Sequence, residues 1–166
     1  PTPAPQHSPR TVTCYHCRRR FDVPGRAMSI SCPWCSRRVT LDDLFVRDRC
    51  WTSRLQTCGR IVVHRRGLVN ARVIEAMEGI EIQGSVEGSV VSGGPVVLGP
   101  GARLRGDLAA PSVSIASGAI IEGGLLRIAA GLPPAHDAPR SRPGSAHAQN
   151  ATTPDVVAHP ALRVRW

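Results

Sequence analysis

Apolar and polar residues alternate in short runs through the middle of the chain. Runs such as Val96-x-Leu98 and Ala102-x-Leu104 place an apolar side chain at every second position. A period of two predicts β-strands with one buried and one solvent-exposed face. Glycine, proline, serine and alanine separate the runs and indicate tight corners, and no run is long enough for a helix that would connect parallel strands.

The alternating runs repeat along the chain at a spacing of about 17 residues. Ile80 matches Val96 at an offset of 16, and Val63 matches Ile80 at 17. The offset of 17 also relates Val96-x-Leu98 to Val113-x-Ile115, Gly101 to Gly118, Ala102 to Ala119, Leu104 to Ile121, Gly106 to Gly123 and Leu108 to Leu125. Such self-similarity is typical of a solenoid, in which each repeat buries its apolar face by stacking on its neighbours.

Three runs and three corners in each repeat predict an all-β fold, a triangular β-helix of about four coils over residues 54–131. A β-sandwich is one alternative, but it favours larger core side chains, and residues 52–131 contain no Phe, Trp or Tyr. A left-handed β-helix of hexapeptide repeats is another, as in acyltransferases and γ-type carbonic anhydrases. Its period of 18 fits less well, and only His64 lies in the repeat to serve such an enzyme.

Catalytic motifs are missing elsewhere in the sequence as well. No serine lies in a nucleophile-elbow context, and no glycine-rich loop is followed by lysine, because the chain has no lysine. The glutamates of the repeat are expected mostly on solvated outer faces or at corners; they are Glu75, Glu78, Glu81, Glu87 and Glu122. We therefore expect a non-enzymatic protein.

Two C-x2-C pairs precede the repeat: Cys14 with Cys17, and Cys32 with Cys35. Each spacing fits a tight turn that points two thiolates at one metal ion, and two such turns close a tetrahedral shell without a site for water. Residues 11–40 are too few for a stable apolar core, so a metal is expected to supply folding energy. We predict a zinc ribbon with one structural Zn²⁺; iron or two disulfides are the alternatives, and His16 is expected at the surface.

The cysteines also bear on the compartment. Residues 1–13 have no apolar segment typical of a signal peptide, and no apolar run approaches the ~18 residues of a membrane span. Six cysteines in such a chain predict a reducing compartment, the cytoplasm. Cys50 and Cys58 lie outside the pairs and are expected to be packed thiols.

The positive charge is concentrated in the N-terminal part of the chain. Of the net charge of +9, residues 1–66 carry 13 Arg and 4 acidic residues, whereas residues 67–131 carry 4 Arg and 6 acidic residues. Arginines follow both cysteine pairs, with Tyr15 and Trp34 nearby, a pattern that suits phosphate neutralisation and base stacking. The candidate nucleic-acid contacts are Arg18, Arg19, Arg20, Arg37 and Arg38; alternatively these arginines are solvated and offset the charge of four thiolates.

Residues 79–88 (GIEIQGSVEG) and 96–108 (VVLGPGARLRGDL) resemble the bactofilins, which are bacterial polymer-forming cytoskeletal proteins. The resemblance covers roughly residues 60–125. It implies a right-handed β-helix that assembles end to end into non-polar filaments without nucleotide. It also implies partners among cell-envelope proteins, and with them a place at the inner face of the membrane.

The predicted zinc ribbon stands where the family has a short apolar N-terminal peptide. We expect this ribbon to cap the N-terminal end of the coil stack, which would leave the other end for self-association. The candidate assembly residues at that end are Leu125, Leu126 and Ile128. Residues 41–53 are expected to be a connector, and residues 1–10 and 132–166 are expected to be disordered because they lack periodic apolar positions.

Overall fold

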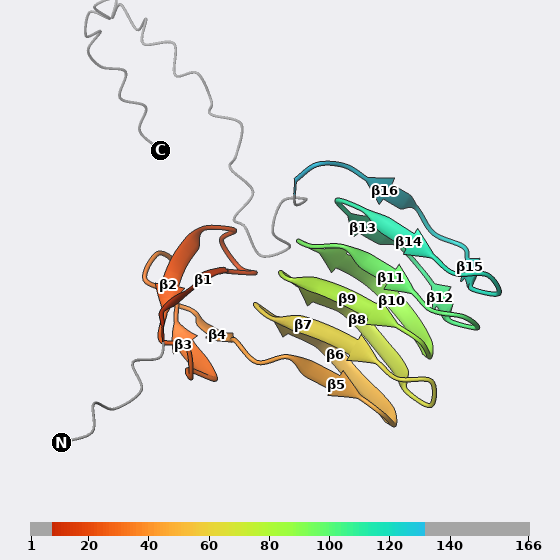
Figure 1. Ribbon diagram of the computed structural model, residues 1–166, viewed down its shortest axis with the longest axis horizontal. Helices are drawn as coiled ribbons and strands as arrows, with labels where there is room; N and C mark the ends of the chain where they lie inside the picture. Colours follow the sequence, from red (N-terminus) through yellow and green to blue (C-terminus); the bar gives the residue numbers. More distant parts are fainter. Residues whose placement is uncertain (1–7, 132–166) are drawn as a thin grey trace, which may run out of the picture.

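The computed structural model describes residues 8–131, which form sixteen β-strands and no helix (Figure 1). A small N-terminal module (residues 10–41) is followed by a β-solenoid. The predicted all-β class, with a small cysteine-containing module before a triangular solenoid, is confirmed. The tail expected to be disordered, 132–166, lies outside the described residues, as do residues 1–7.

The N-terminal module consists of two antiparallel hairpins. β1 (Arg10–Thr13) pairs with β2 (Arg20–Val23), and β3 (Ser29–Ser31) pairs with β4 (Arg38–Thr40). The turn of each hairpin contains one C-x2-C pair. The side chains of β2 alternate between exposed and buried, with Phe21 and Val23 in the core of the module, as their spacing predicts.

The solenoid has five coils of three parallel strand segments each, one coil more than expected. Its first face contains β5 (Leu44–Val46), β7 (Arg60–Val63), β9 (Gly79–Ile82), β11 (Val96–Leu98) and β14 (Val113–Ile115). The long strands of the first three coils run along both remaining faces: β6 (Arg49–Thr57), β8 (Leu68–Ala76) and β10 (Ser85–Ser92). In the last two coils β12 (Arg103–Arg105) and β15 (Ile120–Glu122) form the second face, and β13 (Leu108–Ala110) and β16 (Leu126–Ile128) form the third.

The solenoid starts at Leu44 rather than at residue 54, so most of the expected connector is the first coil. Leu44 of β5 pairs with Ile61, and Cys50 of β6 pairs with Val69. The inward side chains of Leu44, Val46, Cys50 and Leu55 pack in or against the solenoid core, as in the other coils. The outward positions of the first coil include two aromatic residues, Phe45 and Trp51, which are 59% and 74% exposed.

The predicted register is confirmed in the fourth and fifth coils and wrong at two corners. Leu104 pairs with Ile121 as predicted, and Leu104 is fully buried. Val63 pairs with Ile82 rather than Ile80, because corner 64–67 has four residues where the next coil uses two, 83–84. Leu108 likewise pairs with Leu126 rather than Leu125, because corner 123–125 is one residue longer than corner 106–107.

Aliphatic side chains fill the interior of the solenoid. The largest fully buried ones are Ile61, Ile74, Ile82, Leu98, Leu104 and Leu108. The coils approach most closely between the second and third faces, where a Cβ on Gly88 would lie 1.7 Å from the carbonyl oxygen of Ala71. Gly88 has a φ of 140° and Gly106, which stacks on it in the next coil, has a φ of 126°. Only glycine combines that conformation with that spacing.

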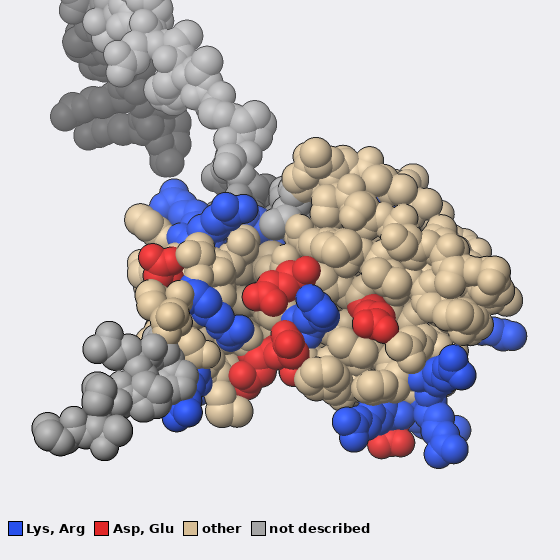
Figure 2. Space-filling model, in the orientation of Figure 1, with Lys and Arg blue, Asp and Glu red and all other residues tan. Residues whose placement is uncertain are grey.

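Both ends of the coil stack are open in the described part of the chain. The strands of the first coil pair only with the second coil, and those of the fifth coil pair only with the fourth. The open end exposes inward side chains of the first face: Leu98 is fully buried, whereas Ile115, which stacks on it in the last coil, is 52% exposed. Figure 2 shows charged side chains over the N-terminal module and the first coils, and few on this face of the last coils.

The N-terminal module packs on the side of the solenoid, so the expectation that it caps the N-terminal end is wrong. Its last strand is followed within a few residues by β5, and the carbonyl oxygen of Thr40 accepts hydrogen bonds from Cys58 N and Thr57 Oγ1. Cys58 and Met77, at the corners that follow the third face, belong to the apolar core of the module. The short linker and these corner contacts fix the module beside the first two coils.

Candidate metal centre

The two cysteine pairs occupy turns of the same shape. In the first turn Arg18 N donates to the carbonyl oxygen of Cys14 at 2.9 Å, and in the second Ser36 N donates to that of Cys32 at 2.8 Å. Arg18 and Ser36 follow their cysteine pairs directly and adopt left-handed conformations with φ of 64° and 58°. This conformation is uncommon for residues other than glycine. Two matching turns therefore present two sulfurs each to the same point.

The four sulfur atoms form a compact cluster. The Sγ atoms of Cys14 and Cys35 are 3.8 Å apart, those of Cys17 and Cys32 are 3.7 Å apart, and all four lie within 4.8 Å of one another. A disulfide needs about 2.05 Å, and all six cysteines are free thiols. A tetrahedron with Zn–S bonds of about 2.3 Å has S···S edges of about 3.8 Å. The spacing fits a tetrahedral metal ion and does not fit disulfides.

The environment of the thiols is consistent with a cationic partner. Burial raises the pKa of Cys14 and of Cys17 above the usual thiol value. Burial opposes ionisation of Cys32 too, but the N–H groups of Cys35 and Trp34 outweigh it and lower the pKa of Cys32. His16 N donates to Cys14 Sγ at 3.4 Å. Such N–H donors stabilise thiolates, and a bound metal ion would supply the remaining stabilisation that burial removes.

His16 lies outside the sulfur cluster. The only metal-sized group of ligands among residues 8–131 consists of the four cysteines. The His16 ring packs against Tyr15, with ring centroids 4.5 Å apart, and its Nδ1 lies 3.4 Å from Arg37 Nη1. His16 thus supports the first turn and leaves the four thiolates as the ligand set.

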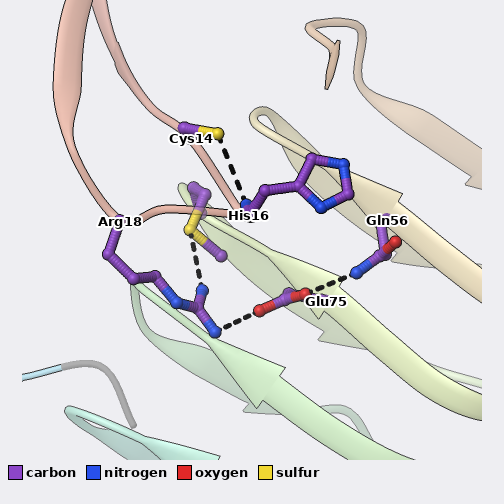
Figure 3. Close-up of polar contacts among 6 residues, drawn as sticks. Cys14, His16, Arg18, Gln56 and Glu75 are labelled. Carbon is purple, nitrogen blue, oxygen red and sulfur yellow. Dashed lines mark hydrogen bonds and ion pairs between the residues drawn. The ribbon is translucent and has the colours of Figure 1, made fainter. Parts of the chain in front are cut away.

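Arg18 connects the first turn to the solenoid through a buried ion pair (Figure 3). Its guanidinium pairs with the carboxylate of Glu75 and donates to Met77 Sδ at 3.3 Å. Gln56 Nε2 donates to the other carboxylate oxygen of Glu75 at 2.7 Å. The side chains of Arg18 and Glu75 are only 15% and 1% exposed. The expectation that Arg18 is available for nucleic acid is therefore wrong, and so is the expectation that Glu75 lies on a solvated face.

Two side chains of the solenoid, Cys58 and Met77, belong to the apolar core of the N-terminal module. Cys58 is fully buried there, which raises the pKa of its thiol to about 12, and Met77 is nearly so. Cys50 is half-buried against the solenoid interior. Both Cys50 and Cys58 are packed thiols, as predicted, and Cys58 belongs to the contact between the two parts.

The structure does not assemble the predicted nucleic-acid contact. Tyr15 is buried and its hydroxyl accepts a hydrogen bond from Thr40 N at 3.2 Å. Arg19 lies over the Trp34 ring at 5.1 Å, so this ring already has a cationic partner. Arg38 donates twice to Ser29 Oγ. Of the five candidate arginines, Arg18 is withdrawn from solvent and Arg19, Arg37 and Arg38 make contacts within the module. Among residues 8–131 the Arg20 side chain makes no hydrogen bond or ion pair.

A comparison with family models gives one match. The model of the bactofilins, described as polymer-forming cytoskeletal, matches residues 42–125, which are 84 of the 166 residues. The match begins just before β5 and reaches the fifth coil, in agreement with the observed start of the solenoid. The chain belongs to the bactofilin family. No curated protein and no solved structure matches it.

The family match accounts for the solenoid but not for the cysteine cluster. Bactofilins are structural proteins, which agrees with the expectation of a non-enzymatic protein. The four cysteines lie before residue 42 and therefore outside the matched region. Within residues 8–131 no helix has the length and apolar character to cross a membrane.

The bactofilin domain ends in an exposed apolar coil that contains the predicted assembly residues. Leu125, Leu126 and Ile128 are 60%, 45% and 57% exposed. Leu126 and Ile128 continue the inward column below Leu108 and Ala110. Leu125 lies at the preceding corner, where its N–H donates to Asp107 Oδ1 at 2.8 Å. Ile115 belongs to the same inward layer and could have been recognised from its match with Leu98.

Proposed function

We propose that this bactofilin is a non-enzymatic scaffold that self-associates through the ends of its solenoid, with a zinc-bound module fixed on its side. The observation that carries the proposal is the open last coil, with inward side chains that are about half exposed and three strands without an outer partner. An unpaired strand edge with apolar neighbours is a template for further strand pairing.

The energetics favour docking of a second copy. About ten backbone hydrogen bonds at ~1 kcal/mol each, together with burial of Ile115, Leu126 and Ile128, would form on the terminal layer. Loss of translational and rotational freedom costs on the order of 4–15 kcal/mol. The balance is favourable when most of the layer is paired and the inward side chains interdigitate.

The lateral position of the N-terminal module supports polymers rather than dimers. The first coil presents β5 and β6 with free outer edges and the partly buried side chains of Leu44, Cys50 and Leu55. Two open ends allow chain growth, whereas a capped end would have stopped it at a dimer.

The four thiolates would hold one structural Zn²⁺. Zinc is the ion for which a tetrahedral four-sulfur set is most typical, and the spacing of the sulfur atoms supports it. Its role would be to fold the two turns and so to place Arg18 against Glu75. A thiolate centre also favours a reducing compartment, the cytoplasm. Cell-envelope partners and a place at the inner face of the membrane rest on the family resemblance alone.

Self-association is tested by a matched pair of substitutions on the last coil. Leu126→Glu adds a charge to the inward layer, and Ile120→Glu adds the same charge to the outer face beside Arg103. We expect Leu126→Glu to shift the protein to monomers in sedimentation velocity without loss of folded structure, whereas Ile120→Glu assembles like the wild type. Equal assembly of the two variants would contradict the proposal.

A further inference from the structure

The first face of the solenoid has edges of opposite charge. Three acidic residues and one arginine lie where its strands begin, and three arginines and one acidic residue lie where its strands end. The acidic edge consists of Asp42, Asp43, Glu78 and Arg60, and the basic edge consists of Arg47, Arg65, Arg66 and Asp48. In Figure 2 the acidic edge lies between the N-terminal module and the face, and the basic edge lies at its lower right.

Most of these charged side chains have no hydrogen-bond or ion-pair partner within residues 8–131. Among residues 8–131, Arg47, Arg65 and Arg66 form no hydrogen bond or ion pair, and all three are exposed. On the acidic edge, Asp43 Oδ1 accepts a hydrogen bond from Arg60 N, whereas the Glu78 carboxylate is exposed and makes no such contact. Both edges can therefore form new ion pairs without breaking existing ones.

The surface between the edges is partly apolar. From the first coil to the fifth, its outward positions are Phe45, Val62, Glu81, Val97 and Ser114, with Phe45 59% and Val97 41% exposed. The central carboxylate of Glu81 accepts a hydrogen bond from Gln83 Nε2 at 2.7 Å, and Glu81 and Val97 line two shallow hollows of ≈ 440 and ≈ 140 Å³, one on the side of each edge. Exposed apolar side chains between charged edges are typical of a protein interface with a polar rim.

We propose that the partner of this face is the same face of a second copy, so that assembled filaments pair side by side; this inference rests on the proposed function. A two-fold axis parallel to the coil stack would place the acidic edge of each copy opposite the basic edge of the other at the same height. An axis across the stack would place like charges together. Charge complementarity therefore selects face-to-face pairing with the two stacks parallel.

The area of the face determines whether single subunits pair or only assembled filaments do. Five strands at ~4.8 Å and a width of ~20 Å give roughly 400 Å² per copy, about half of what a stable interface buries. Single subunits therefore pair weakly. Along two filaments the same contact repeats in every subunit, and the repeated contacts reinforce one another.

A charge-exchange experiment tests the pairing. Arg65→Glu/Arg66→Glu makes both edges acidic, and Asp42→Arg/Glu78→Arg makes both edges basic; no described side-chain contact involves these four residues. In negative-stain images we expect each variant alone to form single filaments and the equimolar mixture to form paired filaments like the wild type. Pairing of the wild type should be lost at about 1 M salt, where the Debye length is about 3 Å.

Three results would overturn the inference: pairing of each variant alone, single filaments in the mixture, or salt-resistant pairing. It would also fail if Arg65→Glu/Arg66→Glu lost binding to anionic vesicles or to a single-stranded oligonucleotide while its filaments still paired. If the wild type formed no filaments, the proposed function would have failed. Lateral pairing would then be decided by sedimentation at high micromolar concentration, where even weak pairing gives salt-sensitive dimers of the mixture that neither variant forms alone.

Discussion

The N-terminal module and the solenoid are stabilised in different ways, although they share one chain and one contact. The solenoid buries its own aliphatic column, and each coil completes the core of the next. The module has two short hairpins whose core includes Cys58 and Met77 from the solenoid and the buried part of its four cysteines. The repeat has a core of its own, whereas the core of the module is completed by the surface that it covers and, under the proposed function, by a metal ion.

The contact between the N-terminal module and the solenoid contains a buried ion pair, Arg18 with Glu75. Glu75 is an outward residue of β8 that becomes buried only because the module covers it, and Arg18 then provides its counter-charge. Loss of the whole module would return Glu75 to water. Loss of Arg18 alone would leave a buried carboxylate with one neutral partner. We therefore expect substitution of Arg18 to weaken the contact by leaving the Glu75 carboxylate buried without a counter-charge. Loss of the metal would not have this cost, because unfolding of the module exposes Glu75 to water.

Loss of the metal should have the largest effect, and only on the module. Cys14→Ser removes one ligand from a site whose apparent binding energy in small zinc domains is about 10 kcal/mol or more. We expect about one equivalent of zinc in the wild type and little in the variant. Amide hydrogen exchange should show hairpins β1–β4 unprotected and the last three coils still protected. Unchanged metal content in Cys14→Ser would contradict the assignment.

Within the solenoid, the next largest effect should come from a charge in the inward column. Leu104→Asp buries a carboxylate without a partner and is expected to cost about 5 kcal/mol or more of a total stability of ~5–15 kcal/mol. Arg103→Asp lies next to it on the exposed face and should cost less than about 1 kcal/mol. Urea denaturation compares the two. Equal costs would contradict the assignment of Leu104 to the inward face and Arg103 to the outward face of β12.

The ion pair between the two parts should have an intermediate effect. Arg18→Met is expected to destabilise docking of the module by about 3–5 kcal/mol, because Glu75 remains buried without its counter-charge. Adding Glu75→Gln should recover part of this loss. Amide hydrogen exchange of the module in Arg18→Met, in Glu75→Gln and in the double variant gives the coupling free energy between Arg18 and Glu75. Additive effects would show that the two charges do not depend on one another.

The smallest predicted effect is a loss of stability at high pH through Cys58. Its pKa is raised from 9.0 to about 12 by burial, so unfolding releases a proton above pH 9. The stabilisation is complete below pH 9 and is lost as the pH rises towards 12. Relative to Cys58→Ala, the wild type should lose about 2 kcal/mol by pH 10.5 in urea titrations. A constant difference across that range would show that Cys58 ionises freely in the folded protein.

The sequence predicts those features that depend on spacing within a short stretch. The alternation around Leu104 and Ile121 determines the register of neighbouring coils, and the two C-x2-C pairs determine the sulfur cluster. The first coil was not recognised because Phe45 and Trp51 occupy its outer positions. The buried state of Glu75 depends on docking of a turn that is 57 positions away in the sequence, and no local pattern reports such a contact.

The most direct test of a scaffold with two open ends is electron microscopy of the purified, zinc-loaded protein. Five coils at ~4.8 Å predict filaments with a rise of roughly 24 Å per subunit, and with density for the N-terminal module along the side rather than at the junctions. Strictly monomeric protein at high micromolar concentration with one equivalent of zinc bound, or dimers that do not grow, would contradict the account.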